Sequence, residues 1–168
     1  MSHLKVAIAL YNRKNLYIWP EDLKRVKAND FFVCKNSGRT RNDSGLSLLS
    51  QIVIKKNGMV YRTLFPGDAQ YKYIPSFKAG LDALVVTHHG GMYKGDIPPM
   101  PNKINKLVYS YGINNTYNHP AAKSISKHQK LNWNKRLDTI NGHVLLGPAT
   151  NIPIKPCIGN CSLDLIQV

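Results

Sequence analysis

The sequence is poor in acidic residues. Aspartates and glutamates number 9 against 23 lysines and arginines, which gives the 168-residue chain a formal net charge of +14 at pH 7, and Glu21 is its only glutamate. A surface this basic attracts polyanions through long-range fields and counterion release. We therefore expect a nucleic acid or another polyanion as a partner; a solvated basic surface without a particular partner is the alternative.

Long apolar runs are absent as well. No run reaches the ~20 residues needed to cross a bilayer, and the apolar stretch before Asn12 and Arg13 is too short for a good signal peptide. These absences predict a cytoplasmic protein without membrane association. The hydrophobic fraction of 43% is ordinary for a globular protein, so residues 1–168 are expected to form a single domain with a hydrophobic core.

Cysteines are few and odd in number: Cys34, Cys157 and Cys161. The pair Cys157 and Cys161 could hold a metal or form a disulfide, but no second pair completes a cysteine-rich zinc site. Reduced, structural cysteines are the favoured interpretation.

Apolar segments that end in polar loops predict an α/β fold. A strand at 46–54, a hairpin turn at 55–58 and a strand at 59–65 come first, and further strands follow at 81–86 and 106–111. This order is typical of layered α/β proteins. The other expected elements are a strand at 4–10, a helix at 20–26, a loop at 35–44, a helix or loop at 71–78, a loop at 90–101, a helix at 121–137, and strands at 144–146 and 163–168.

Polar side chains gather directly after three of the predicted strands. Asp68 follows the second strand of the hairpin, and His88 and His89 follow the next strand. The cluster after the third strand consists of Asn115, Tyr117 and His119. Loops at strand ends are where α/β folds assemble ligand and metal sites, and carboxylate and imidazole are ligands that zinc, manganese and iron accept. The order of these clusters predicts a metal site.

Each cluster alone also has a purely structural interpretation. Gly67-Asp68 is a common turn dipeptide. The two adjacent histidines could form a hydrogen-bonded core pair, and the segment that ends at Pro120 could cap the following helix.

A resemblance to a known family rests on four segments, which occur in order along the chain. They read Arg41-Asn42-Asp43-Ser44, Leu64-Phe65-Pro66-Gly67-Asp68-Ala69, Leu84-Val85-Val86-Thr87-His88-His89-Gly90-Gly91 and Ser110-Tyr111-Gly112-Ile113-Asn114-Asn115-Thr116-Tyr117-Asn118-His119-Pro120. This pattern resembles the metallo-β-lactamase superfamily, and most closely the metallo-hydrolase domain of DNA-uptake competence proteins. The resemblance covers about residues 40–125. It implies an αββα layered fold of which 41–168 is the C-terminal half, with 1–40 a divergent N-terminal segment.

The resemblance also implies roles for the polar residues. Asp68 corresponds to a ligand that bridges two metal ions, zinc or manganese, and His89 to a terminal ligand, with His88 as the alternative. His119 becomes the candidate catalytic residue, for proton transfer or substrate binding. Asn115 and Tyr117 are the candidates for substrate binding.

One defining motif of that superfamily, H-x-H-x-D-H, does not occur in the sequence, since His3 is the only histidine before Asp68. The expected site is therefore incomplete, and a partner chain or a second copy of this chain would supply the missing ligands. The expected function is that of a metal-dependent hydrolase acting on phosphodiesters or nucleic acid. A non-catalytic nucleic-acid-binding or interaction module that retains the fold is the alternative, and a hydrolase of another ester, such as a lactam or thioester, is a third.

Overall fold

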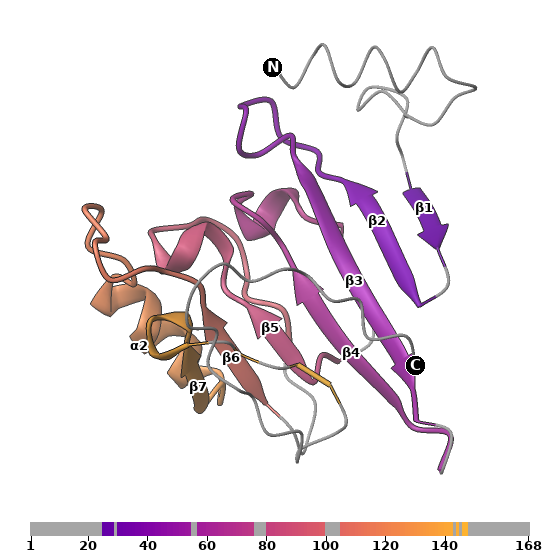
Figure 1. Cartoon of the computed structure of the whole chain (residues 1–168). Coiled ribbons are helices and arrows are strands. Elements are labelled where there is room, and N and C mark those ends of the chain that lie inside the picture. Colours follow the sequence, from indigo (N-terminus) through magenta and orange to yellow (C-terminus); the bar gives the residue numbers. More distant parts are fainter. Residues whose placement is uncertain are drawn as a thin grey trace, which may run out of the picture.

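The computed structural model describes residues 25–28, 30–54, 57–75, 80–99, 105–142, 144 and 146–147, with the backbone alone for 25–28. Its centre is one seven-stranded sheet whose strands follow each other in chain order (Figure 1). The first four strands pair antiparallel, and the last four pair parallel. The strands are β1 (Arg25–Ala28), β2 (Phe31–Lys35), β3 (Leu46–Val53), β4 (Val60–Phe65), β5 (Ala83–Val85), β6 (Lys106–Tyr109) and β7 (Lys135–Asp138).

The hairpin between β3 and β4 is confirmed. These strands pair in register from Leu48 with Phe65 to Val53 with Val60. At the turn, the Ile54 N–H donates to the Met59 carbonyl at 2.7 Å. Gly58 has a φ of 68°, which glycine adopts without steric cost. The predicted strands at 81–86 and 106–111 correspond to β5 and β6, and the loop at 35–44 separates β2 from β3.

The helix α2 (Ala122–Lys130) lies against the sheet near β6 and β7 (Figure 1). It buries Ser124 and His128. Three short 3-10 turns, η1 (Tyr71–Tyr73), η2 (Thr87–Gly90) and η3 (Thr139–Asn141), follow β4, β5 and β7. The buried hydrophobic cluster on this side of the sheet contains Leu49, Leu64, Tyr71, Leu81, Leu84, Val86, Tyr93, Leu107, Tyr109 and Trp133.

The helix predicted at 121–137 was wrong in its second half, because α2 ends at Lys130 and 135–138 is the strand β7. Asn132 has a φ of 64°, its N–H donates to the Gln129 carbonyl, and the Trp133 N–H donates to the His128 carbonyl. These two bonds form a Schellman motif, with asparagine in the left-handed position that glycine usually takes. Trp133, which follows, is fully buried, and the chain then returns to the sheet as β7.

Some of the other predicted elements are wrong, and others lie outside the described residues. The helix at 20–26 is wrong at its end, since Arg25 begins β1, and the strand β2 was not predicted. Val144 and Leu146, where a late strand was expected, lie outside any strand. The predicted strands at 4–10 and 163–168, as well as Cys157 and Cys161, lie outside the described residues.

A mixed α/β fold is therefore established, and β2 belongs to the same sheet as the segment after residue 40. Cys34 is a buried free thiol in β2. In the part of the chain that the structure describes, no helix has the length and apolar character to span a bilayer.

Replacement of Leu84 by alanine tests the position of the core. Leu84 is fully buried in β5, so its truncation should lower the free energy of unfolding by about 2–5 kcal/mol. Leu131→Ala is the matched control, because this leucine is 49% exposed, and it should change stability by less than ~1 kcal/mol. Urea unfolding of both variants measures the difference. Equal losses would contradict the assignment of the core.

Candidate active site

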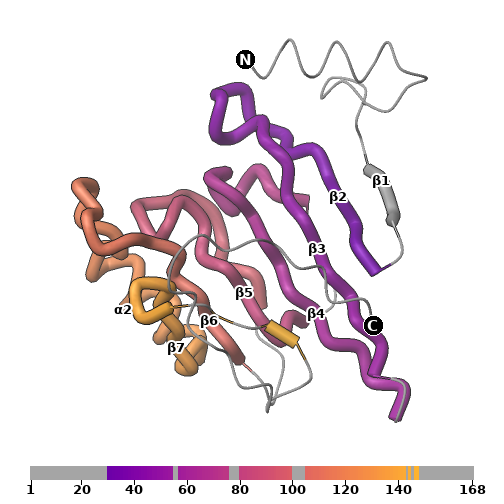
Figure 2. The backbone as a smooth tube through the Cα atoms, in the orientation of Figure 1, coloured from indigo at the N-terminus to yellow at the C-terminus, as the bar shows by residue number. Residues whose placement is uncertain are grey.

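The predicted site residues come together because β4, β5 and β6 are parallel. Their carboxyl ends lie at one edge of the sheet, so the loops that follow them leave the same end of the molecule (Figure 2). Asp68 lies in the loop after β4, and His88 and His89 lie in η2 after β5. Ser110 directly follows β6. The structure thus brings together segments that are far apart in the sequence.

His89 is fixed between a backbone carbonyl and a carboxylate. Its Nδ1 lies 2.6 Å from the Ser110 carbonyl oxygen, and its Nε2 lies 3.4 Å from Asp68 Oδ1. A carbonyl oxygen only accepts hydrogen bonds, so Nδ1 carries a proton. In a neutral imidazole, Nε2 then presents a lone pair beside the negatively charged carboxylate. A second proton on the ring or a cation between the two groups would relieve this repulsion.

This donor set fits the metal ions that the sequence predicted. An imidazole nitrogen and a carboxylate oxygen are ligands of zinc and manganese. A ring N–H that donates to a backbone carbonyl is the usual support behind a metal-binding histidine, because it fixes both tautomer and orientation. Asp68 and His89 are each about half exposed, so an ion could reach them from solvent.

The backbone of η2 separates the two histidines. His88 and His89 both have left-handed conformations, with φ of 50° and 53°, which side-chain-bearing residues adopt at a steric cost. The loop after β4 holds this conformation in place, because the His88 N–H donates to the Gly67 carbonyl at 3.1 Å. The Thr87 hydroxyl lies 3.2 Å from the same carbonyl. As a result, His89 lies beside Asp68 while His88 packs against His119.

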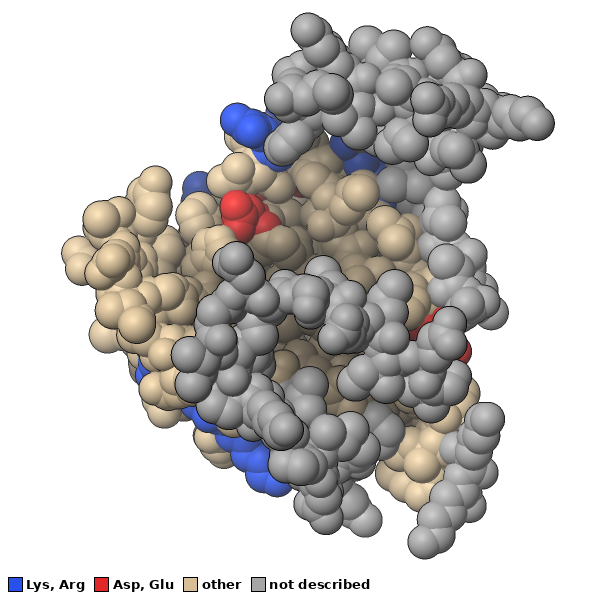
Figure 3. Space-filling model, in the orientation of Figure 1, with Lys and Arg blue, Asp and Glu red and all other residues tan. Residues whose placement is uncertain are grey.

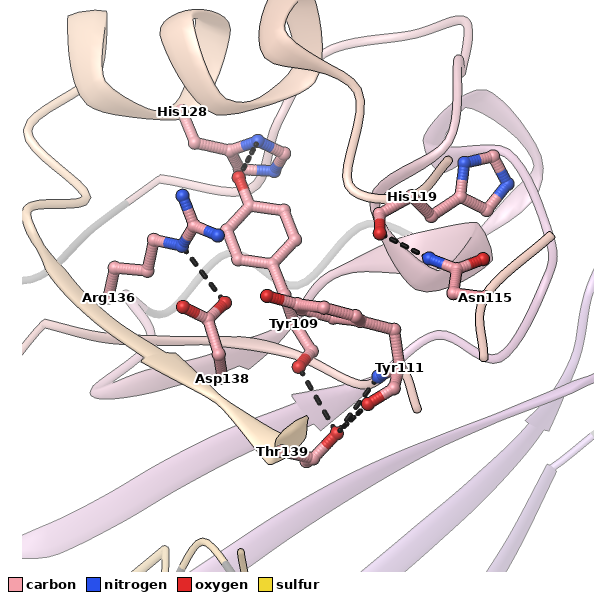
Figure 4. A network of polar contacts seen from close by, with 8 residues as sticks. All are labelled: Tyr109, Tyr111, Asn115, His119, His128, Arg136, Asp138 and Thr139. Atoms are coloured by element: carbon pink, nitrogen blue, oxygen red, sulfur yellow. Dashed lines mark hydrogen bonds and ion pairs between the residues drawn. The ribbon is translucent and has the colours of Figure 1, made fainter. Parts of the chain in front are cut away.

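His119, the predicted catalytic residue, lies in this second pair. Its ring is 5.6 Å from that of His88, edge to face, and Tyr117 stacks on it at 6.0 Å. The Asn115 side-chain amide donates to the His119 carbonyl (Figure 4). A Cβ on Gly91 would lie 2.8 Å from His119 Cε1, so this close approach requires glycine. The loop after β6 therefore holds His119 over η2.

The electrostatics of His119 favour a neutral ring. Burial lowers its pKa, and the nearby His88 and His89 lower it further, against the opposite effect of Asp68. Its Nδ1 is buried without a hydrogen-bond partner among the described residues. A neutral imidazole has one unprotonated ring nitrogen, which can accept a proton.

The described residues contain no group of three or more His, Cys, Asp and Glu side chains that could hold a metal ion. Asp68 and His89 form one pair, and His88 with His119 forms another. Two of the three predicted ligands are thus in contact, whereas His88 lies beside the predicted catalytic residue.

A cavity of about 520 Å³ opens beside His89. Asn115, Tyr117 and His119 line it, so the predicted substrate-binding residues border the same space as the predicted ligand. Thr139 also lines it, and the Thr139 hydroxyl accepts the Tyr111 N–H at 2.9 Å, which fixes the chain just after β6 (Figure 4). The sequence gives no signal for Thr139, because the residues before it belong to the segment predicted as helix up to residue 137.

A buried polar chain supports the site from α2 and was not predicted. His128 is fully buried, and its Nδ1–H donates to the Ser124 carbonyl at 2.8 Å. Its Nε2 therefore accepts from the Tyr71 hydroxyl at 3.0 Å. The Tyr71 oxygen in turn accepts the Thr87 N–H at 3.5 Å. Burial lowers the pKa of His128, which keeps the ring neutral as this chain requires.

Asp43, in the Arg41-Asn42-Asp43-Ser44 motif, connects a further loop to the site. Its carboxylate accepts the Thr40 hydroxyl at 2.8 Å, the Gln70 N–H at 3.1 Å and the Gln70 side-chain amide at 3.3 Å. Burial raises the pKa of this carboxyl, but the hydrogen bonds and the charge of Lys72 outweigh that effect, so the pKa is lowered. The loop between β2 and β3 is thereby fixed to the loop that carries Asp68.

Comparison with known proteins gives no match: no protein-family model matches the chain, and neither a curated protein nor a solved structure is significantly similar to it. The resemblance to the metallo-β-lactamase superfamily therefore rests on the four motifs themselves.

Tyr71→Phe tests the buried polar chain. The substitution removes the donor to His128 Nε2 and leaves a buried acceptor unpaired, which should lower the free energy of unfolding by about 1–3 kcal/mol. Tyr117→Phe is the control, because Tyr117 is 80% exposed, and its effect should stay below ~0.5 kcal/mol. Chemical denaturation measures both. A Tyr71→Phe variant as stable as the control would show that the bond contributes nothing.

The lowered pKa of Asp43 makes stability depend on pH. A carboxyl with a lowered folded-state pKa stabilises the fold above its ordinary pKa of 3.8, and this contribution is lost as the pH falls through the folded-state value. The stability difference between the wild type and Asp43→Asn should therefore shrink between neutral pH and strongly acidic pH. Thermal unfolding across this range measures it. Asp96→Asn, at an exposed aspartate, is the control, and an equal pH dependence there would contradict the assignment.

Proposed function

We propose that this chain is a metal-dependent hydrolase-like protein of the metallo-β-lactamase type that acts on phosphodiesters. Its metal site consists of ligands from this chain and of further ligands from outside it. The observation that carries the proposal is His89, whose Nδ1–H donates to the Ser110 carbonyl while its Nε2 faces Asp68. The arrangement presents a nitrogen and an oxygen donor to the same point, which is the chemistry of a zinc or manganese ligand pair.

Three further features support this function. The four segments that resemble the superfamily all contribute to one edge of the sheet or to the loops fixed to it. A cavity borders the ligand pair and His119. The net charge of +14 favours substrates that carry phosphate groups. The αββα layered arrangement, with this chain as its C-terminal half, is part of the same proposal.

Each candidate site residue has its own role in this proposal. Asp68 and His89 would hold the metal ion, which when bound supplies the positive charge that activates water and offsets the charge of a phosphodiester. His119 lines the cavity, and its lowered pKa favours a neutral imidazole that can take up a proton. Asn115 positions the loop of His119, and Tyr117 offers an exposed ring to the substrate. A partner chain or a second copy supplies the remaining ligands.

A second candidate function is a nucleic-acid-binding module without catalysis. It is favoured by the observation that the described residues hold no group of three or more ligand side chains. This module would keep the basic surface and bind nucleic acid with a steep salt dependence.

Metal titration of the chain tests the proposed site. Calorimetry with Zn²⁺ or Mn²⁺ should detect one weakly bound ion, and Asp68→Ala and His89→Ala should each weaken it by at least about tenfold. Asp96→Ala, at an exposed aspartate of another loop, should leave the affinity unchanged.

Three outcomes would overturn the proposal or part of it. Binding that is insensitive to both ligand variants would show that the site lies elsewhere. Two tightly bound ions in the isolated chain would contradict an incomplete site. Nucleic-acid binding by a wild type that takes up neither Zn²⁺ nor Mn²⁺ would favour the binding module.

A further inference from the structure

Four exposed basic residues lie at the same end of the sheet as Asp68. They come from two loops and one 3-10 turn, and we call them the basic rim: Arg39, Arg41, Lys72 and Lys94. In Figure 3, several basic side chains lie near an acidic one at the upper end of the molecule, and other basic side chains lie at its lower left. The rim thus borders the candidate site.

Backbone hydrogen bonds join the three segments that carry the rim. The Ser37 N–H donates to the Tyr73 carbonyl at 2.9 Å, which ties the loop between β2 and β3 to η1. The Lys72 N–H donates to the Lys94 carbonyl at 3.2 Å, which ties η1 to the loop after η2. The three segments that carry the rim therefore lie side by side although the sequence separates them.

Two close backbone contacts pack the segments that carry the rim directly against their neighbours. A Cβ on Gly95, whose φ is 94°, would lie 2.3 Å from the Lys72 nitrogen. A Cβ on Gly38 would lie 2.2 Å from the Asp43 Cβ. Both glycines let one segment pack directly on the next, and Asp43 bonds to Gln70 beneath them. The backbone segments that carry the rim residues are therefore held in place by close packing.

The rim residues form no close ion pair within the described part of the chain. The ion pairs found there are His89 with Asp68 and Arg136 with Asp138, and neither involves the rim. Asp43 is buried, and its attraction to Lys72, which lowers the pKa of the Asp43 carboxyl, offsets part of the rim charge. Asp96 is the exposed acid on the same loop as Lys94 and offsets part of the charge.

We propose that the basic rim is the docking surface for the phosphate backbone of a nucleic-acid strand, which it leads to Asp68 and His89. The proposal rests on the proposed function, because it concerns the substrate of that site. The four cations come from three different segments, which suits a chain of repeated phosphates better than a single phosphate ion. Their loops also share an edge with the cavity-lining residues after β5 and β6.

The chain also offers a matched control surface at the opposite end of the sheet. Lys135 begins β7, and parallel strands begin at the edge opposite to the one where Asp68 lies. Lys130 ends α2, and both lysines are exposed. Reversal of these two charges alters the net charge as much as reversal of two rim lysines, but leaves the rim intact.

The experiment compares Lys72→Glu/Lys94→Glu with Lys130→Glu/Lys135→Glu. Binding of a fluorescently labelled single-stranded DNA oligonucleotide is measured by anisotropy over a range of salt concentrations. The rim variant should bind about tenfold or more weakly, with a salt slope lower by roughly 2. The control variant should change both quantities much less. Urea unfolding of both variants verifies that they are folded.

Three outcomes would contradict the proposed role of the rim in nucleic-acid binding. Equal weakening in both double variants would show that net charge alone attracts DNA. A wild type that does not bind the oligonucleotide would refute the rim outright. Rim-dependent binding to vesicles containing phosphatidylserine, without binding to DNA, would assign the surface to a membrane instead.

Asp68→Ala separates this inference from the proposed function. The variant should lose metal binding while its affinity for the oligonucleotide stays within about twofold. Rim-dependent DNA binding by a wild type that binds no metal at Asp68 would support the rim and refute the metal site. If metal binds at Asp68 but the rim substitutions leave the affinity for DNA unchanged, only the proposed role of the rim is refuted.

Discussion

The hydrogen bond from the His88 N–H to the Gly67 carbonyl joins the loops after β4 and β5 at the site. It holds η2 in a left-handed backbone conformation that is costly for histidine and that directs the two imidazoles to different neighbours. His89 meets Asp68, and His88 meets His119. The site therefore depends on loop-to-loop contacts more than on the strands alone, and a change that freed Gly67 from η2 would disturb both pairs together.

Two buried polar groups extend this support away from the site. Neutral His128 connects α2 through Tyr71 to Thr87, the residue before His88. Ionised Asp43 connects the loop between β2 and β3 to the loop after β4. Each is satisfied by its partners, which is the condition for a polar group to be buried at little cost. The fold thus surrounds a half-exposed ligand pair with two buried polar side chains whose own hydrogen bonds are satisfied.

The sequence predicted the elements whose signals are local. Alternating apolar residues and Gly58 were enough for the β3–β4 hairpin, and apolar runs were enough for β5 and β6. It failed where a long-range contact decides: basic, exposed Lys135 and Arg136 read as helix surface, yet pairing with β6 makes them a strand. The end of α2 failed for a related reason, because an asparagine at the left-handed position carries a weaker stop signal than glycine.

The sequence by itself determined which chemical groups are available and in which order: one carboxylate and three imidazoles after successive apolar strands, on a chain with a large positive charge. Only the tertiary structure decided which of them meet. Spacing along the chain could not separate His88 from His89, because their directions depend on φ angles imposed by Gly67 and on the Ser110 carbonyl at the end of β6. The basic rim could not be predicted either, since backbone bonds between distant loops, and not sequence proximity, bring the segments that carry it together.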